Sequence, residues 1–213
     1  MSEPLVDEPV SLPISRSDRA FDGTIWDVRR ETFEYNGSDV EREFVDHPGA
    51  VSVLVIDEQD RILLIKQYRH PIRSREWEIP AGLLDVNGES ALAAAKRELA
   101  EEVDLEAEEW WVLSDYSATP GGSNEVTRIF LARSLKPTTA FAREHEEADL
   151  ELRWVTLDEA VDTVLARKLQ NPALVVAVLA ASASKSRGWA TLAPADTPWP
   201  EYARLHSNAL RPE

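Results

Sequence analysis

The stretch from Gly82 to Leu105 reads GLLDVNGESALAAAKRELAEEVDL and joins a glycine-led loop to a helical pattern rich in carboxylates. At about 100° per residue, Glu98 and Glu102 lie side by side, about 40° apart, at the edge of an apolar stripe. Glu101 points further into solvent, and Arg97 lies on the side away from the stripe. The pattern predicts an amphipathic helix whose buried stripe is formed by Leu92, Ala95, Leu99 and Val103.

The carboxylates of this helix predict a site for a divalent cation and phosphate. Like charges four residues apart destabilise a helix by about 0.2–0.5 kcal/mol, a cost that a cation bound between Glu98 and Glu102 would remove. Because the ligands are oxygen atoms only, they suit Mg²⁺ or Mn²⁺. The alternative is a solvated acidic face, which is the usual reason for a charge run on a helix.

The residues on either side of the helix favour the cation site. Six residues separate Gly82 from Glu89, and seven more precede the run RELAEEVDL that begins at Arg97. This spacing closely resembles the Nudix box, G-x5-E-x7-R-E-U-x-E-E-x-G-U, where U is an apolar residue. The resemblance implies a hydrolase that acts on a nucleoside diphosphate linked to some other moiety.

Two positions depart from the box. The first spacer is one residue longer than in the family pattern, and the change falls in the Asp85–Gly88 loop, where an insertion is tolerable. Asp104 stands where the family has a glycine just past the helix end, a position that often needs the left-handed conformation. Aspartate adopts that conformation at some strain. The departures therefore affect a loop and a turn, and leave the helix that would bind metal intact.

Length and composition exclude several classes of protein. The 213 residues suit one catalytic domain with extensions better than two domains. A net charge of −16 with 23 basic residues argues against nucleic acid as a partner. The absence of cysteine excludes disulfides, thiol catalysis and cysteine-ligated zinc. Without a signal-peptide pattern or a long apolar run, the sequence predicts a soluble, cytoplasmic protein with no membrane partner.

Residues 1–46 form the first of three predicted parts of the chain. Up to about residue 18 the sequence is polar and contains prolines, which predicts a mobile arm. The segment from Phe21 to Val45 predicts strands, with Asn36-Gly37-Ser38-Asp39 as a hairpin signal. Packing against a partner subunit is the function we expect of this part, and a solvated outer sheet is the alternative.

Residues 47–186 form the predicted catalytic domain. The apolar, β-branched runs AVSVLVI and RILLIKQY predict two central strands. Further strands are expected at 110–116, 125–132 and 150–155, and helices at 157–167 and 171–184. This order predicts an α/β sandwich with a mixed sheet covered on both faces, as in the Nudix fold, preceded by an antiparallel β region. Residues 187–213 are expected to form an irregular tail that docks through Trp189 and Trp199.

Pro120 narrows the resemblance to one subfamily. It lies fifteen residues beyond Leu105 in TPGGSNE, and a proline at about that distance is similar to the mark of ADP-ribose pyrophosphatases. The segments QYRHP, WEIPAGLLD and EHEEAD agree with the actinobacterial members of that subfamily. The resemblance implies Mg²⁺- or Mn²⁺-dependent hydrolysis of ADP-ribose to AMP and ribose 5-phosphate by a homodimer. The alternatives are another nucleoside diphosphate derivative or a nucleoside triphosphate as substrate, and a regulator that binds a nucleotide without cleaving it.

The resemblance also implies the groups that would carry the chemistry. Arg97 would orient the carboxylates of the helix. A glutamate of the acidic loop would be the general base, with Glu147 the first choice and Glu146 the second, whereas a solvated acidic loop is the alternative. The implied metal ligands are the carbonyl oxygen of Ala81 and the carboxylates of Glu98, Glu101 and Glu102.

Substrate contacts are predicted in three segments. Arg69 follows an apolar strand where the strand leaves the sheet, and its guanidinium suits bidentate phosphate contact. The resemblance implies that Trp26 stacks the adenine and that Arg29 or Arg30 holds the terminal ribose, often in the neighbouring subunit. The alternatives are a surface arginine at position 69 and an edge strand with exposed arginines. The third segment contributes Pro120 and Gly121. The four histidines lack metal-ligand spacing and are assigned no role.

Overall fold

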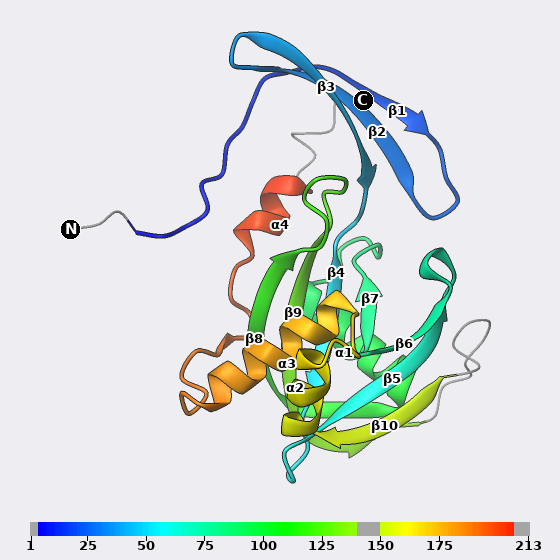
Figure 1. Ribbon diagram of the computed structural model, residues 1–213, viewed down its shortest axis with the longest axis vertical. Coiled ribbons are helices and arrows are strands. Elements are labelled where there is room, and N and C mark those ends of the chain that lie inside the picture. The colour runs from blue at the N-terminus through cyan, green and yellow to red at the C-terminus, as the bar shows by residue number, and fades with distance from the viewer. Residues whose placement is uncertain (1–3, 140–149, 207–213) are drawn as a thin grey trace.

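The computed structural model describes residues 4–139 and 150–206 (Figure 1). Its largest sheet has the order β11-β8-β9-β4-β7, in which β4 and β9 are parallel and all other neighbours are antiparallel. Its strands are β4 (Ala50–Val55), β7 (Ala81–Leu83), β8 (Leu105–Ser117), β9 (Val126–Pro137) and β11 (Ala193–Pro194). A second, antiparallel sheet consists of β10 (Glu151–Thr156), β5 (Arg61–Arg69) and β6 (Ser74–Glu78), with the short 3-10 helix η1 (His70–Ile72) after β5.

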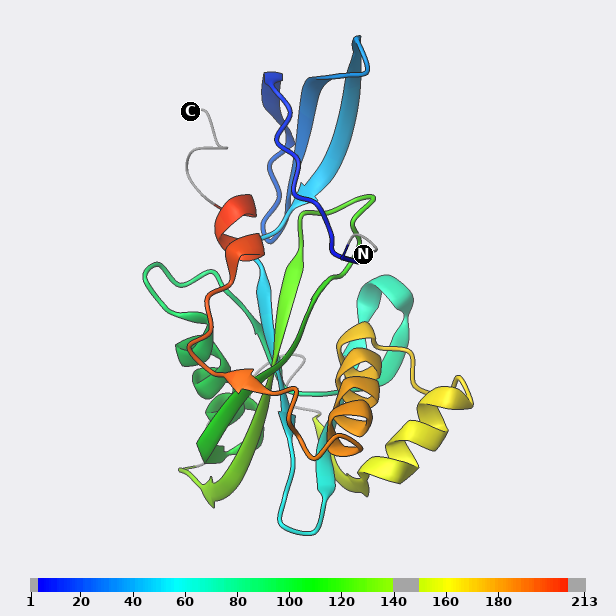
Figure 2. The same cartoon turned by 90° about the vertical axis from the view of Figure 1, so that its left-hand side faces the viewer.

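Helices cover both faces of these strands (Figure 2). Helix α1 (Ala91–Val103) lies on one face, whereas α2 (Leu157–Leu165) and α3 (Pro172–Lys185) lie on the other. Successive residues of a strand point to opposite faces. Accordingly Val53 of β4 belongs to the core that contains α1, and Leu54 belongs to the core that contains α3. The predicted sandwich with a mixed sheet is confirmed.

The ends of α1 follow from its sequence. The Ser90 hydroxyl accepts a hydrogen bond from the backbone N–H of Ala93 at 3.2 Å, which caps the first turn. At the other end, Asp104 has φ 55° and ψ 37°, and its backbone N–H donates to the carbonyl oxygen of Ala100. Asp104 therefore adopts the left-handed conformation expected of it, and the chain turns directly from α1 into β8.

The N-terminal antiparallel sheet projects away from the core (Figure 1). It consists of β1 (Ile14–Phe21), β2 (Asp27–Tyr35) and β3 (Ser38–Asp46). Asn36 and Gly37 form the predicted hairpin turn, with φ of 52° and 75°. The prediction of a mobile arm up to residue 18 was wrong for the last five of those residues, because β1 pairs with β2 along its length.

The C-terminal segment is more regular than predicted. β11 pairs with β8, and residues 200–205 form the helix α4 (Pro200–Leu205). Trp189 packs against the core, and the Arg128 guanidinium lies 4.7 Å from the ring centroid of Trp199. Docking through these two tryptophans is therefore confirmed, and within residues 187–206 only β11 and α4 depart from the irregular conformation expected for the tail. Within residues 4–139 and 150–206, no helix is long and apolar enough to cross a membrane.

Candidate active site

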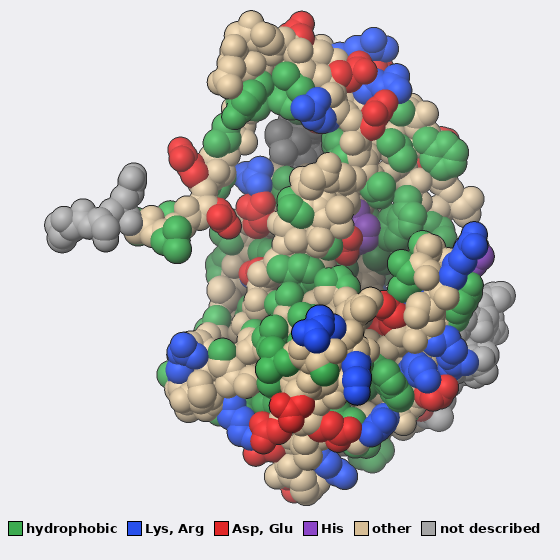
Figure 3. All heavy atoms as spheres, viewed as in Figure 1, with side chains coloured by type: hydrophobic (Ala, Val, Ile, Leu, Met, Phe, Trp, Pro, Cys, Tyr) green, Lys and Arg blue, Asp and Glu red, His purple; other side chains and the backbone are tan. Residues whose placement is uncertain are grey.

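A cavity of about 850 Å³ opens between the projecting sheet and the core, where the surface is hollowed (Figure 3). It lies at the place where β3 ends and β4 begins. Four parts of the chain supply the polar and aromatic side chains of its wall: the N-terminal sheet, the strands β4 to β7, the loop after β8 and the start of α3. Those side chains include Trp26, His47, Ser52, Arg69, Glu78, Tyr116, Ser123, Glu125, Thr127 and Asn171.

Arg97 organises the carboxylates beside this cavity. Its Nη1 lies 2.5 Å from Glu98 Oε1 and 3.2 Å from Glu101 Oε2. Its Nε and Nη2 donate to the two carboxylate oxygens of Glu89 at 3.1 and 3.0 Å. The two hydrogen bonds raise the pKa of Arg97 and lower the pKa of Glu89. Arg97 thus makes the ion pairs expected of a residue that orients the acidic cluster.

Two of the box carboxylates, Glu98 and Glu102, contact the backbone at the start of β7. Glu102 is buried, and its Oε2 accepts a hydrogen bond from the backbone N–H of Ala81 at 3.0 Å. The Glu98 side chain lies directly over the Cα atom of Gly82. Ala81 and Gly82 both line the cavity. Helix α1 therefore brings two carboxylates to the backbone at the edge of the pocket.

The donor set at this edge suits a hard divalent cation. Glu98 and Glu102 flank the Ala81-Gly82 backbone, and every available donor is an oxygen atom. In the described ranges no three Asp, Glu or His side chains are grouped so that they alone could hold a metal ion. Cations of the Mg²⁺ type commonly complete their coordination with water and substrate phosphates. The two carboxylates and the Ala81 carbonyl are therefore the candidate protein ligands.

Arg69 lines the cavity, as predicted for a phosphate contact. It forms a two-pronged ion pair with Glu78, with Nε to Oε1 at 2.8 Å and Nη2 to Oε2 at 2.7 Å. Gln67 Nε2 donates to the same carboxylate at 3.3 Å. Glu78 is 2 % exposed, so the pair fixes the guanidinium at the cavity wall. Glu78 is not among the site residues predicted from the sequence, and its role in holding Arg69 was missed.

An aromatic wall closes another side of the cavity. The rings of Trp26 and His47 are stacked, with centroids 4.5 Å apart and planes inclined by 18°. Burial lowers the pKa of His47 to about 4, so the imidazole is neutral at physiological pH. Its Nε2 lies 3.9 Å from Glu125 Oε1, and burial raises the pKa of Glu125. Stacking surface and hydrogen-bond acceptors therefore face the same space.

Arg29 and Arg30 point elsewhere in this chain. Arg29 pairs with Asp46 at 2.9 Å, and Arg30 pairs with Glu43 on the exposed side of the N-terminal sheet. Neither residue lines the described cavity. These ion pairs stiffen the base and the middle of the sheet, and substrate contact by either arginine stays a prediction.

The loop after β8 and the acidic loop account for the other predicted residues. Thr119, Gly122 and Ser123 line the cavity, whereas Pro120 and Gly121 belong to the same turn without lining it. Substrate contact by Pro120 or Gly121 therefore stays a prediction. The predicted bases Glu147 and Glu146 lie outside the described residues.

Among the wall residues that the sequence did not predict are His47, Glu78 and Glu125. His47 lies just before a predicted strand, in DHPGAV, and Glu125 begins one, in SNEV, whereas Glu78 ends β6, a strand that was not predicted. Polar residues at strand ends often take part in binding or catalysis, because functional sites form in the loops at the edges of sheets. Which of many such residues converge depends on pairings over long stretches of chain, such as the bond from the His47 backbone N–H to Asn124 Oδ1.

Comparison with known proteins agrees with this geometry. Residues 46–177 match the model of the NUDIX domain family. The chain is 40% identical over 184 residues to the ADP-ribose pyrophosphatase of Mycobacterium tuberculosis, which covers 86% of this chain and 88% of the relative. It is 32% identical over 164 residues to the methanol dehydrogenase activator of Bacillus methanolicus, with 76% and 88% covered. A crystal structure of an ADP compounds hydrolase has the same fold, with a TM-score of 0.71, 24% identity, and coverage of 86% of this chain and 99% of the other.

Proposed function

Because the chain belongs to the Nudix family, we propose that it hydrolyses the pyrophosphate bond of ADP-ribose to give AMP and ribose 5-phosphate. One observation carries the proposal: a single cavity joins the backbone beside Glu98 and Glu102, the guanidinium of Arg69 and the aromatic wall of Trp26. A nucleoside diphosphate linked to a sugar needs all three features. The 40% identity to an ADP-ribose pyrophosphatase supports the same substrate.

Each part of the cavity would bind a different part of the substrate. The exposed face of Trp26 offers a rigid surface for the adenine. Arg69 offers paired N–H donors to the pyrophosphate oxygens, which requires that it share or leave its contact with Glu78. Glu125 and the Ser123 hydroxyl, both in the wall, offer hydrogen-bond partners to the hydroxyl groups of a ribose.

The box residues would serve the reaction itself. Glu98 and Glu102, with the carbonyl of Ala81, would hold Mg²⁺ or Mn²⁺, and Glu101 at their edge would contribute less directly. A bound cation of this kind neutralises charge that develops on the phosphoryl oxygens and makes a water molecule easier to ionise. Arg97 would keep the carboxylates in place. Glu147 or Glu146 is the proposed base, because carboxylates committed to a cation are poor bases.

A substrate panel tests the proposal. ADP-ribose, other ADP-sugars, dinucleotides and nucleoside triphosphates are each incubated with Mg²⁺ or with Mn²⁺, and the phosphate-containing products are identified. Glu102→Gln, prepared in the same way, gives the background from contaminating hydrolases. We expect ADP-ribose to have the highest kcat/KM and to give AMP. Equal or better turnover of a nucleoside triphosphate would contradict the assignment to ADP-ribose.

The relative named as an activator of methanol dehydrogenase keeps a second function open, that of a regulator that binds a nucleotide. The presence of both Glu98 and Glu102 favours hydrolysis, because a protein that only binds the ligand has no need of two carboxylates at the scissile bond. Titration calorimetry with ADP-ribose and Mg²⁺ separates the two functions. Binding without the appearance of AMP would identify a regulator.

We also propose that the protein is a homodimer whose contact involves the N-terminal sheet. Three large apolar side chains are well exposed in or beside this sheet: Phe21 at 61%, Ile25 at 70% and Tyr35 at 52%. Large apolar side chains that are exposed on a projecting element are typical of an interface. Light scattering measures the mass in solution, and a mass of one chain at micromolar concentration would contradict this proposal.

A further inference from the structure

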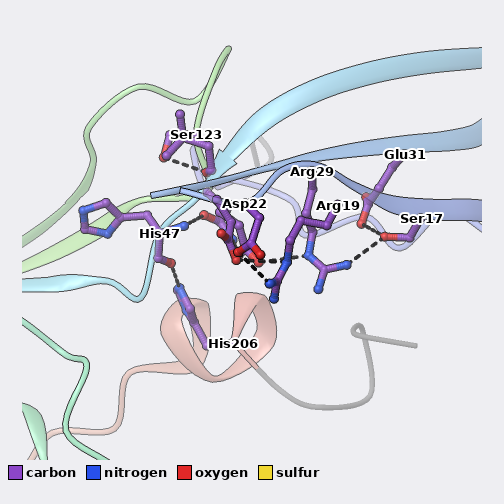
Figure 4. Close-up of polar contacts among 12 residues, drawn as sticks. Ser17, Arg19, Asp22, Arg29, Glu31, His47, Ser123 and His206 are labelled. Atoms are coloured by element: carbon purple, nitrogen blue, oxygen red, sulfur yellow. Dashed lines mark hydrogen bonds and ion pairs between the residues drawn. The ribbon is translucent and has the colours of Figure 1, made fainter. Parts of the chain in front are cut away.

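The C-terminal helix reaches a residue of the cavity wall that lies 159 positions away in sequence (Figure 4). His206, just after α4, approaches the carbonyl oxygen of His47 with its Nε2 at 2.8 Å. The ring of His47 points away from this contact (Figure 4). Helix α4 therefore holds the backbone of His47 from behind while the ring of His47 faces the cavity.

Aromatic stacking holds the His206 ring in place for its contact with His47. The ring of Tyr202 stacks on His206, with centroids 4.5 Å apart, and on Trp199, with centroids 5.0 Å apart. Tyr202 also lies so close to the backbone at Gly49 that a Cβ atom there would be 2.7 Å from its ring. Because Gly49 has φ of 89°, a side chain at this position would be strained as well as crowded. The helix thus fits closely against the chain between β3 and β4.

Arg128 anchors the segment that leads into α4. It donates to the backbone carbonyl oxygens of Thr197 at 2.6 Å and Pro198 at 3.3 Å, and its guanidinium is held by Asp115 through two bonds of 2.8 Å. The Arg128 side chain is only 4% exposed. The part of the tail before α4 is therefore fixed to β8 and β9.

The side chain of His47 connects its restrained backbone to the cavity wall. Its Nδ1 accepts a hydrogen bond from the backbone N–H of Gly49 at 3.0 Å, so in the neutral ring the proton lies on Nε2. That nitrogen faces Glu125, and the His47 ring stacks on the ring of Trp26. The position of the His47 backbone therefore determines how the His47 ring lies against Trp26 and against Glu125.

We propose that α4 is a positioning element of the substrate site, in which His206 fixes His47 and thereby the Trp26 ring that receives the nucleobase. The inference rests on the proposed function for the nature of the substrate. His206 is a positioning residue, because it does not line the described cavity. Loss of its contact should loosen the wall that binds substrate and leave the acidic helix α1 undisturbed.

The test is His206→Ala, assayed on ADP-ribose with Mg²⁺. Loss of the contact with His47 and of the stack on Tyr202 predicts an increase in KM of about five- to tenfold, with kcat within about twofold of the wild-type value. His206→Gln retains an amide donor and should recover most of the affinity. Glu201→Ala removes a half-buried ion pair within the same helix and should change neither constant. If His206→Ala does not fold, Tyr202→Leu replaces it, because this variant removes the stack on His206 but keeps an apolar contact.

A second readout does not need turnover. Acrylamide quenching of tryptophan fluorescence is compared between wild type and His206→Ala, and again with Trp26→Phe in both chains. A rise in quenching that disappears with Trp26→Phe supports the inference even if ADP-ribose is not the substrate. Unchanged KM and unchanged quenching in a folded His206→Ala protein would overturn it. A wild-type protein inactive on ADP-ribose would instead contradict the proposed function alone.

Discussion

A Cβ atom on Gly82 would lie 2.0 Å from a carboxylate oxygen of Glu98. The first glycine of the box and the first glutamate of its helix are therefore in direct contact, although fifteen residues separate them. Glu98 can occupy its position beside the Ala81-Gly82 backbone only because residue 82 has no side chain. This contact gives a physical reason why a glycine in the loop and a glutamate in the helix occur together in the box.

Gly82→Ala should therefore displace Glu98 and reduce activity far more than stability. The side chain of Glu98 can swing aside at small energetic cost, but the carboxylate then leaves the position proposed for cation binding. We expect kcat on ADP-ribose to fall at least about a hundredfold, while the melting temperature falls by only a few degrees. The control is Gly188→Ala, where an added Cβ meets no atom within 4 Å and only φ of 62° opposes it. Equal activity of the Gly82→Ala and Gly188→Ala proteins would refute the argument.

The box glutamates should differ in their contribution to the reaction. Glu102 is buried against Ala81 and Glu98 is largely covered, whereas the Glu101 side chain is 42% exposed. Glu98→Gln and Glu102→Gln should each lower kcat by several orders of magnitude, because charge neutralisation matters most in the transition state. Glu101→Gln should be milder. The measurement is kcat at saturating Mg²⁺ with thermal melting as a check on folding, and a near-normal rate for Glu102→Gln would place the cation elsewhere.

Local patterns in the sequence were sufficient to predict most of the core. The stripe that contains Leu99 and the turn at Asp104 both depend on residues within one helix length. The same holds for α3, where Asn171 and Pro172 form the expected start. Helical periodicity and capping are short-range effects, so they can be predicted without knowing which other elements pack against the helix.

Elements that depend on distant partners were missed. β1 has the sequence ISRSDRAF, which lacks apolar alternation and gains its structure by pairing with β2 and by the bond from the Ser17 hydroxyl to Glu31. The role of His47 depends on two contacts, the stacking of its ring on Trp26 and the contact of its carbonyl oxygen with His206. A single histidine between two strands carries no local signal of either contact.

The buried imidazole of His47 should make stability depend on pH. Its pKa is lowered by burial from 6.5 to about 4, so between these values the unfolded chain binds more protons than the folded chain. The free energy of unfolding should therefore fall as the pH falls through this window, by about 1–2 kcal/mol at pH 5 from this residue. Urea unfolding at pH 7 and pH 5 measures the loss, which should be smaller in His47→Gln. Identical losses in the two proteins would show that His47 does not resist protonation in the folded state.

Mixed dimers can show which chain Trp26 serves. The sequence suggested that Trp26 contributes to the partner's active site, but in the structure Trp26 stacks on His47 of its own chain and lines that chain's cavity. Trp26→Ala and Glu102→Gln chains are produced together with different tags, and the complex that carries both tags is purified. Each site of such a dimer has one defect if Trp26 serves its own chain, so kcat/KM on ADP-ribose should stay as low as in the better parent protein.

If Trp26 instead crosses to the partner, one site of the mixed dimer contains both defects and the other contains none. Activity would then return to about half of the wild-type value per dimer, which would contradict the arrangement within one chain. Dimers with both substitutions in the same chain are the matched control, since they should give the opposite outcome in each case. Failure to recover any complex with both tags, under conditions where both chains fold, would show that the N-terminal sheet does not mediate a stable dimer, despite the exposed side chains of Phe21 and Tyr35.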